Sequence, residues 1–212
     1  MLVGERMTKP VLTISPDVPV QEAVAQMRKE HIRRFPVIDK KGKLVGIVSE
    51  SDLMNASPSE ATTLSVWEVN YLLSKITVER VMTKDVITVT EDTPLEEAAR
   101  IMSDKKIGAL PVMKGEKLVG IITETNLFRI FLELLGARSE GVRVSFLVKD
   151  IPGKFAEIAI AVRDVGGNIV AFVTTSGDAP GYGQITMKVQ GVPLDKLHKT
   201  IWPFVEKVID IR

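Results

Sequence analysis

The 212-residue chain has no cysteine, only two histidines and few aromatic side chains. Without cysteine it can form no disulfide, no zinc–thiolate site and no cysteine nucleophile. His31 and His198 fall in different predicted domains, so neither a Ser/His/Asp set nor a metal-binding histidine cluster is evident. No Walker-type phosphate loop is present. The sequence therefore predicts a protein that is not an enzyme and holds no metal and no redox cofactor.

The sequence also has no excess of charge of either sign and no long apolar run. The 28 basic and 27 acidic residues balance, which gives no electrostatic support for a nucleic-acid partner. The first residues do not read as a signal peptide. The most apolar stretch near a helix, residues 127–135, contains Arg129 and Glu133 and is too short to cross a bilayer. We expect a soluble cytoplasmic protein with no membrane partner.

The chain is organised around an internal repeat. The run Lys-Leu-Val-Gly-Ile-Val-Ser-Glu-Ser-Asp-Leu at residues 43–53 returns as Lys-Leu-Val-Gly-Ile-Ile-Thr-Glu-Thr-Asn-Leu at residues 117–127. Upstream, Met7-Thr8-Lys9 returns as Met82-Thr83-Lys84, and the register holds for about thirty residues. The sequence thus contains two copies of one structural unit.

Each unit predicts the same series of elements. A β-branched strand (11–14; 86–90) precedes a helix whose apolar face has helical spacing. Two strands follow (35–38 and 44–48; 110–113 and 118–122), and then a second helix, which in the second copy runs from about Glu124 to Leu135 with Gly136 as its cap. The predicted buried faces are Val20, Ala23, Val24, Met27 and Leu95, Ala98, Ala99, Met102.

The first helix of the second copy carries a start signal. Thr93 is placed as its N-cap, Pro94 as its first residue, and Glu96 completes a capping box. Val18 stands at the place of Thr93 in the first copy, so that helix has the weaker cap.

Two further segments surround the repeats. We place the first repeat at 1–60, a helical connector at 61–76 and the second repeat at 77–136. The connector helix is predicted from a Ser65–Glu68 capping box. It either packs on the core or serves as a lid or dimer contact. Residues 142–212 follow another plan, βαββαβ, which predicts an antiparallel sheet with two helices on one face. The glycine-rich run from Gly177 to Gly183 reads as a hairpin loop.

Polar residues gather where the repeated strand meets the following helix. Backbone N–H groups and the helix dipole can hold an anion there, and the hydroxyls of Ser49 and Thr123 can donate to a phosphate. Asp52 is an acceptor suited to the hydroxyls of a ribose. The alternative is that Ser49 and Thr123 only cap their helices.

Residues 1–136 resemble a tandem pair of CBS domains, by the Gly46–Asp52 run and the Arg34–Asp39 run before it. The resemblance implies an α/β (α+β) pair with pseudo-twofold symmetry and two clefts that bind AMP, ADP or ATP, with S-adenosylmethionine as a further candidate. In one cleft Asp52 would take the ribose and Ser49 the phosphate. Its partners from the second repeat would be Thr93, Ala98, Ile107, Gly108 and Ala109.

The other cleft departs from the family pattern. Thr123 and Asn126 would face Val18, Ala23, Ile32, Arg33 and Arg34, and Asn126 replaces the usual aspartate. An amide binds a ribose hydroxyl without charge and more weakly. The two arginines are bulky and would reach phosphates from the mouth of the cleft. We therefore expect the Asp52 cleft to be the better nucleotide site.

Residues 142–212 resemble a ferredoxin-like ACT domain, by the Asp150-Ile151-Pro152-Gly153 turn and the Gly167-Asn168-Ile169 turn. The resemblance implies side-by-side pairing, with an amino acid bound at the interface near Asp150, Gly153, Asn168 and Ile169. Some ACT domains only dimerise.

The whole order, CBS–CBS–ACT, is similar to the AcuB-type acetoin-utilisation proteins. It implies a homodimer, formed through the CBS pair and the ACT domain, that regulates carbon metabolism through an unknown protein partner. The alternative is a structural dimerisation scaffold with vestigial clefts. A DNA-binding regulator has neither a helix-turn-helix segment nor a basic face to support it.

Overall fold

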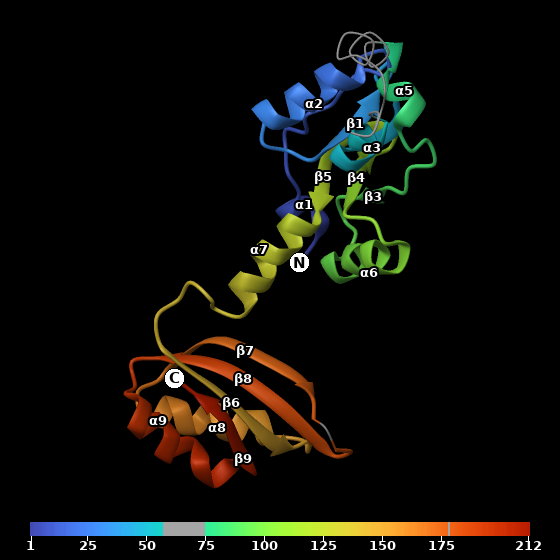
Figure 1. Cartoon of the computed structure of the whole chain (residues 1–212). Helices are drawn as coiled ribbons and strands as arrows, with labels where there is room; N and C mark the ends of the chain where they lie inside the picture. Colours follow the sequence, from blue (N-terminus) through green and yellow to red (C-terminus); the bar gives the residue numbers. More distant parts are fainter. Residues whose placement is uncertain (57–74, 178) are drawn as a thin grey trace. The chain divides into compact units, whose positions relative to one another are not determined.

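The computed structural model describes residues 1–56, 75–177 and 179–212. Most of the expected connector helix, with Ser65 and Glu68, lies outside these residues. The chain separates into two compact units, Met1–Leu127 and Phe128–Arg212 (Figure 1).

The first unit contains the two repeats up to Leu127, within α7, and the repeats share their order of elements except that the second has one more short strand, β3. In the first repeat these are α1 (Val3–Arg6), α2 (Val20–Lys29), β1 (Arg34–Ile38), β2 (Leu44–Ser49) and α3 (Glu50–Asn55). In the second they are α5 (Val78–Val81), β3 (Val89–Thr90), α6 (Leu95–Lys105), β4 (Ala109–Lys114), β5 (Lys117–Thr123) and α7 (Glu124–Leu134).

The two central hairpins have the same register. Val37 pairs with Gly46 in the first and Val112 with Gly120 in the second, and an irregularity follows each pair. The apolar faces expected on α2 and α6 are largely confirmed, because Val20, Ala23, Met27, Leu95, Ala98 and Met102 are all buried. Val24 and Ala99 are only partly buried.

The strands expected ahead of these helices are shorter than the β-branched runs. Only Ile14 of the first run bridges to Val37, and only Val89–Thr90 forms a strand in the second. Leu12 and Thr13 are exposed. A β-branched composition favours extended backbone, but a strand also needs a partner along its length.

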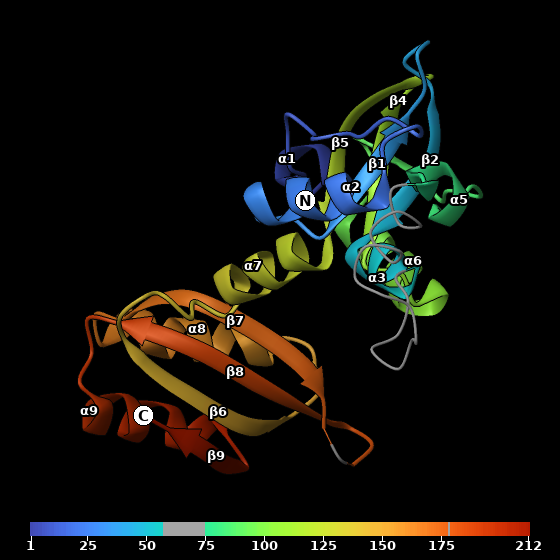
Figure 2. The same cartoon turned by 45° about the horizontal axis from the view of Figure 1, so that its top comes forward.

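The opening segment of each repeat packs on the other repeat. Thr8 exchanges backbone hydrogen bonds with Ile121 of β5, and Thr83 exchanges them with Ile47 of β2. Figures 1 and 2 show the same exchange, with α1 beside β5 and α5 beside β2. The sequence repeats therefore do not coincide with the spatial halves of this unit.

The exchange also explains how α2 and α6 begin. Their N-caps are Pro19 and Pro94, and neither has a side-chain cap. Instead, Val20 N–H donates to the Ile76 carbonyl at 2.9 Å and Leu95 N–H to the Met1 carbonyl at 3.2 Å. Carbonyls of the exchanged segments thus satisfy N–H groups that a helix start leaves unpaired.

The predicted capping box at α6 is therefore wrong. Pro94 is the N-cap and not the first helical residue, and Glu96 completes no box. The Thr93 hydroxyl accepts a hydrogen bond from Thr90 N–H at 3.1 Å. Thr93 thus closes the turn before the helix.

The second unit is a four-stranded antiparallel sheet with two helices on one side (Figure 1). The order β7-β8-β6-β9 is that of the expected ferredoxin-like βαββαβ fold. Its elements are β6 (Val142–Lys149), α8 (Lys154–Asp164), β7 (Asn168–Ser176), β8 (Tyr182–Gln190), α9 (Leu194–Ile201), the short 3₁₀ helix η1 (Trp202–Phe204) and β9 (Lys207–Ile211). Of the predicted hairpin loop, Gly177 and Gly181 lie between β7 and β8, whereas Gly183 already belongs to β8.

The core of this unit lies between the sheet and its helices. Phe146 of β6, Ile185 of β8, Ile158 of α8 and Leu197 of α9 are fully buried in it. Helix α7 ends as expected at Gly136, whose φ of 58° suits a residue without a side chain. Gly136 N–H donates to the Glu133 carbonyl and Ala137 N–H to the Leu132 carbonyl, which closes the last turn.

Among the described residues, no helix is both long and apolar enough to cross a membrane.

Gly46 and Gly120 permit the exchange of the opening segments, and this can be tested. A Cβ at Gly46 would collide with the Met82 thioether and lie 3.1 Å from the Thr83 carbonyl oxygen. We predict that Gly46→Ala lowers the free energy of unfolding by about 1–3 kcal/mol. Chemical denaturation measures this, and adding Met82→Ala should restore part of the loss.

The matched control is Gly183→Ala, whose Cβ would meet nothing closer than 3.7 Å. An equal loss of stability in Gly183→Ala, or no coupling between Gly46 and Met82, would contradict this account.

Candidate nucleotide cleft

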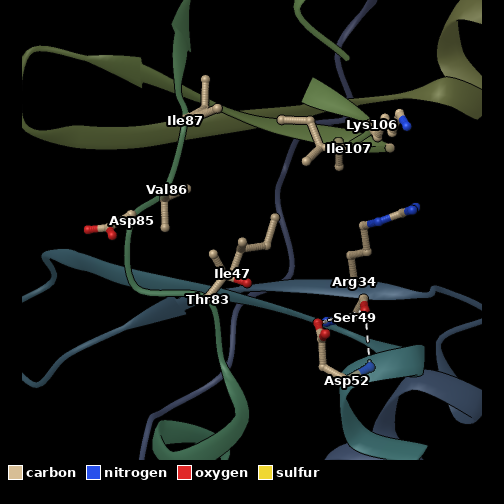
Figure 3. Close-up of a pocket in the computed structure, with 12 residues that line it drawn as sticks. Arg34, Ile47, Ser49, Asp52, Thr83, Asp85, Val86, Ile87, Lys106 and Ile107 are labelled. Carbon is tan, nitrogen blue, oxygen red and sulfur yellow. Dashed lines mark hydrogen bonds between the residues drawn. The ribbon is translucent and has the colours of Figure 1, made fainter. Parts of the chain in front are cut away.

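A cavity of about 270 Å³ lies beside the first strand–helix junction (Figure 3). It draws residues from both repeats and from the exchanged segment after α5. Its lining residues are Arg34, Ile47, Ser49, Asp52, Thr83, Asp85, Val86, Ile87, Lys106, Ile107, Gly108 and Ala109. The cavity is therefore a product of the pairing of the repeats.

The junction at Ser49 and Asp52 is a closed capping box. Asp52 Oδ2 accepts from Ser49 N–H at 2.8 Å and from the Ser49 hydroxyl at 2.7 Å. Ser49 Oγ accepts in turn from Asp52 N–H at 3.2 Å. The Ser49 hydroxyl proton is thus engaged with Asp52. Within the part of the chain that the structure describes, Asp52 Oδ1 makes no hydrogen bond and remains an acceptor on the cavity.

The second junction has the same box with an amide in it. Asn126 Oδ1 accepts from Thr123 N–H at 2.9 Å and from the Thr123 hydroxyl at 2.7 Å. Asn126 Nδ2 donates to the Thr8 hydroxyl at 3.3 Å, and the side chain is buried. Both polar atoms of this amide therefore have partners inside the protein.

Arg34, which was expected in the second cleft, lines the cavity beside Ser49 and Asp52. Figure 3 shows its side chain extending from β1 toward Ile107 and Lys106, on the same side as Ser49 and Asp52. A side chain at Gly108 would collide with Arg34 Nη2 and Glu124 Oε2. Gly108 thus leaves the space that the arginine fills. Arg33, in the bend before β1, is exposed and does not line the cavity.

Five residues expected in the Asp52 cleft line the cavity: Ser49, Asp52, Ile107, Gly108 and Ala109. Thr93 and Ala98 do not. Ala98 is fully buried on the core face of α6, and Thr93 is held at the preceding turn. In the first repeat, Val18, Ala23 and Ile32 likewise pack in the hydrophobic core.

The sequence reasoning missed the residues supplied by the exchanged segment, namely Thr83, Asp85, Val86 and Ile87. The repeated Met-Thr-Lys run marks this segment, but nothing in it shows that it crosses to the other repeat. Figure 3 shows it opposite Arg34, with the Asp85 carboxylate directed away from Arg34. Lys106, the C-cap of α6, was also missed.

The expected amino-acid site in the second unit is not assembled within one chain. β6 and β7 both pair antiparallel with β8, so they run parallel to each other. Asp150 follows the end of β6, whereas Asn168 begins β7. Asp150 and Gly153 therefore lie at one end of the sheet, and Asn168 and Ile169 at the other. A ligand that contacts both sets needs two copies of the chain.

Among the described residues, no group of three or more histidine, aspartate or glutamate side chains is placed to hold a metal ion.

The fold and the repeated junctions define the class of protein. The sequence profile of the CBS domain matches residues 3–59 and 78–133, which together make up more than half of the chain. The chain belongs to the CBS domain family. A second profile, that of the TTHA0829-like ACT domain, matches residues 140–212. The protein is thus a tandem CBS pair followed by an ACT-like domain.

Characterised relatives match the CBS part. The chain is 32% identical over 131 residues to L-aspartate semialdehyde sulfurtransferase of Methanocaldococcus jannaschii, a match that covers 61% of this chain and 23% of that enzyme. It is 39% identical over 152 residues to the chloroplastic CBS domain-containing protein CBSX1 of Arabidopsis thaliana, covering 62% of this chain and 64% of that protein. The chain therefore spans less than two thirds of either relative.

Solved structures also match this part. A putative acetoin utilization protein, AcuB, from Vibrio cholerae is 33% identical with a TM-score of 0.54, covering 66% of this chain and 98% of that one. The CBS domain pair of protein MJ0100, solved with 5′-methylthioadenosine and S-adenosyl-L-methionine, is 31% identical with a TM-score of 0.53 at the same coverage. CBSX2, solved with AMP, is 31% identical with a TM-score of 0.53, covering 63% of this chain and 97% of that one. CBS pairs similar to this one thus bind adenosine ligands.

The amide at Asn126 suggests how to test the contribution of Asp52 to the stability of the first junction. Since an amide closes the same box at Asn126, we predict that Asp52→Asn changes the free energy of unfolding by no more than about 0.5 kcal/mol. Asp52→Ala removes the acceptor and should cost about 1 kcal/mol. Denaturant titration of both variants measures their free energies of unfolding and tells the two effects apart.

The control is Ser51→Ala, an exposed position on α3 outside the box, which should be neutral. If Asp52→Asn destabilised the protein as much as Asp52→Ala, the two junctions would not be structurally equivalent.

Proposed function

We propose that the protein is a non-catalytic regulator that binds an adenosine nucleotide in the cavity beside Ser49 and Asp52. The observation that carries the proposal is this cavity, in which a carboxylate acceptor, two cationic side chains and an apolar wall face one space. Similar CBS pairs bind AMP, or S-adenosylmethionine and 5′-methylthioadenosine.

The parts of the cavity match the parts of a nucleotide. Asp52 Oδ1 can accept hydrogen bonds from the ribose hydroxyls, while Oδ2 stays in the capping box. Ile47, Val86 and Ile107 offer an apolar surface to the adenine. Ser49 can donate to a phosphate only if its hydroxyl turns away from Asp52, so its role in binding is secondary to its role in the box.

The second junction is the weaker site in this proposal. The Asn126 amide is buried and bonded to Thr123 and Thr8, so a ligand would have to displace a partner to reach it. This observation favours a vestigial second cleft. Vestigial clefts are one feature of the alternative function, a structural dimerisation scaffold, and this feature has structural support at the second junction only.

The remaining roles rest on the domain order. We propose that the protein forms a homodimer, that its ACT-like domain either takes an amino acid between two chains or only dimerises, and that the nucleotide signal passes to a protein partner in carbon metabolism. The match to L-aspartate semialdehyde sulfurtransferase covers only 23% of that enzyme, so its activity is not transferred to this chain. A regulatory effect requires that the ligand bind two conformations with different affinity.

Calorimetric titration with AMP, ADP, ATP and S-adenosylmethionine tests the proposal. We predict saturable binding of at least one ligand, with affinity weakened about tenfold by Asp52→Asn, because a charged acceptor becomes neutral. Since Asn126 shows that an amide keeps the box closed, the loss would report on the ligand and not on folding.

The matched control is Asp104→Asn, the same substitution on the exposed side of α6 and away from the cavity. It should bind as the unchanged protein does. Absence of binding by all four ligands at millimolar concentration would leave only the scaffold alternative.

A further inference from the structure

The charged side chains of the cavity are not evenly distributed along it. Arg34 and Lys106 lie on the side of Ser49 and Asp52, as Figure 3 shows. Asp85 lies on the opposite side, with its carboxylate directed away from Arg34. A nucleoside whose ribose meets Asp52 would therefore direct its 5′ substituent toward two cations.

Neither cation is held in an ion pair within the part of the chain that the structure describes, and neither makes a side-chain hydrogen bond there. Arg34 Nη2 and Glu124 Oε2 both lie within 2.5 Å of the point where a Gly108 Cβ would stand, so the carboxylate is near the arginine although the two form no ion pair. Arg34 is also half-buried, where a charge interacts more strongly than in open water. Two cations at one end of the cavity, neither of them in an ion pair, are suited to an anion.

The position of Lys106 has a conformational cost. Its φ of 53° and ψ of 42° place it in the left-handed region, which residues with a side chain rarely adopt. Glycine or asparagine ends a helix this way with less strain. The equivalent residue of the first repeat, His31, has a φ of 52°, so the backbone turn belongs to both repeats. The fold thus fixes the turn, and the lysine adds a charge beside this cavity.

We infer that the cavity selects adenosine ligands by the charge of their 5′ substituent, and that Arg34 and Lys106 are the residues that make the selection. It takes phosphorylated adenosine and discriminates against the neutral thioether 5′-methylthioadenosine and against the S-adenosylmethionine sulfonium. This inference rests on the proposed function, and it decides between the two ligand classes that similar CBS pairs bind.

The size of the discrimination follows from the contacts. A charge-assisted hydrogen bond to a phosphate is about twice as strong as a neutral one, so each cation should contribute about tenfold in affinity. The contribution should decline as ionic strength rises, because the cavity opens to solvent. The apolar and ribose contacts should not depend on salt.

Titration calorimetry of the full chain with AMP and with 5′-methylthioadenosine, at low and high salt, tests the inference. The unchanged protein should bind AMP at least tenfold more tightly, and S-adenosylmethionine should bind no better than the thioether. Arg34→Gln and Lys106→Asn should each weaken AMP about tenfold and change 5′-methylthioadenosine less than twofold. Asparagine is chosen at position 106 because it tolerates the left-handed turn.

The controls are Arg28→Gln and Lys105→Gln, which remove the same charges at exposed helix positions outside the cavity and should leave the affinity for AMP unchanged. Equal binding of AMP and thioether by the unchanged protein, or an equal loss for both ligands in the variants, would overturn the charge selection and leave the nucleotide site in place. Absence of binding by every ligand would instead remove the proposed function and this inference with it.

Discussion

The reciprocal exchange of opening segments is the interaction on which the first unit depends. Thr83 forms two backbone hydrogen bonds with Ile47, at 2.9 and 3.0 Å, and Thr8 forms two with Ile121, at 2.9 and 3.2 Å. The segments also supply carbonyls to the first N–H groups of α2 and α6. One set of backbone contacts thus joins the repeats, starts two helices and brings the Thr83–Ile87 segment to the wall of the cavity. Gly46 is needed because the Met82 side chain lies against it.

The same arrangement makes the two junctions chemically unequal. Both boxes close with nearly the same distances, 2.8 and 2.7 Å at Asp52 and 2.9 and 2.7 Å at Asn126. In the Asp52 box, the carboxylate oxygen Oδ1 still faces the cavity as an acceptor. In the Asn126 box, the amide Nδ2 donates a hydrogen bond to the Thr8 hydroxyl instead. A pseudo-symmetric fold can therefore present one polar site and one internal hydrogen-bond network from nearly identical sequences.

Much of this could be predicted from the sequence, because the signals were local. The repeat, the central hairpins, the βαββαβ order and the Gly136 cap follow from periodicity and turn residues, and so does the alternative that Ser49 caps its helix. The exchange could not be predicted, since no local pattern shows which repeat a segment packs against. This is why the Thr93 cap was wrong and why Thr83, Asp85 and Val86 were missed. Arg34 lines the cavity beside Asp52, which the sequence pattern around it does not indicate.

A crystal structure of the full chain with AMP tests the central claim most directly. The account predicts ligand density in the cavity between Ile47, Val86 and Ile107, with the ribose at Asp52 Oδ1 and the phosphate beside Arg34. Density at the Thr123–Asn126 junction, with none in the cavity beside Asp52, would contradict it.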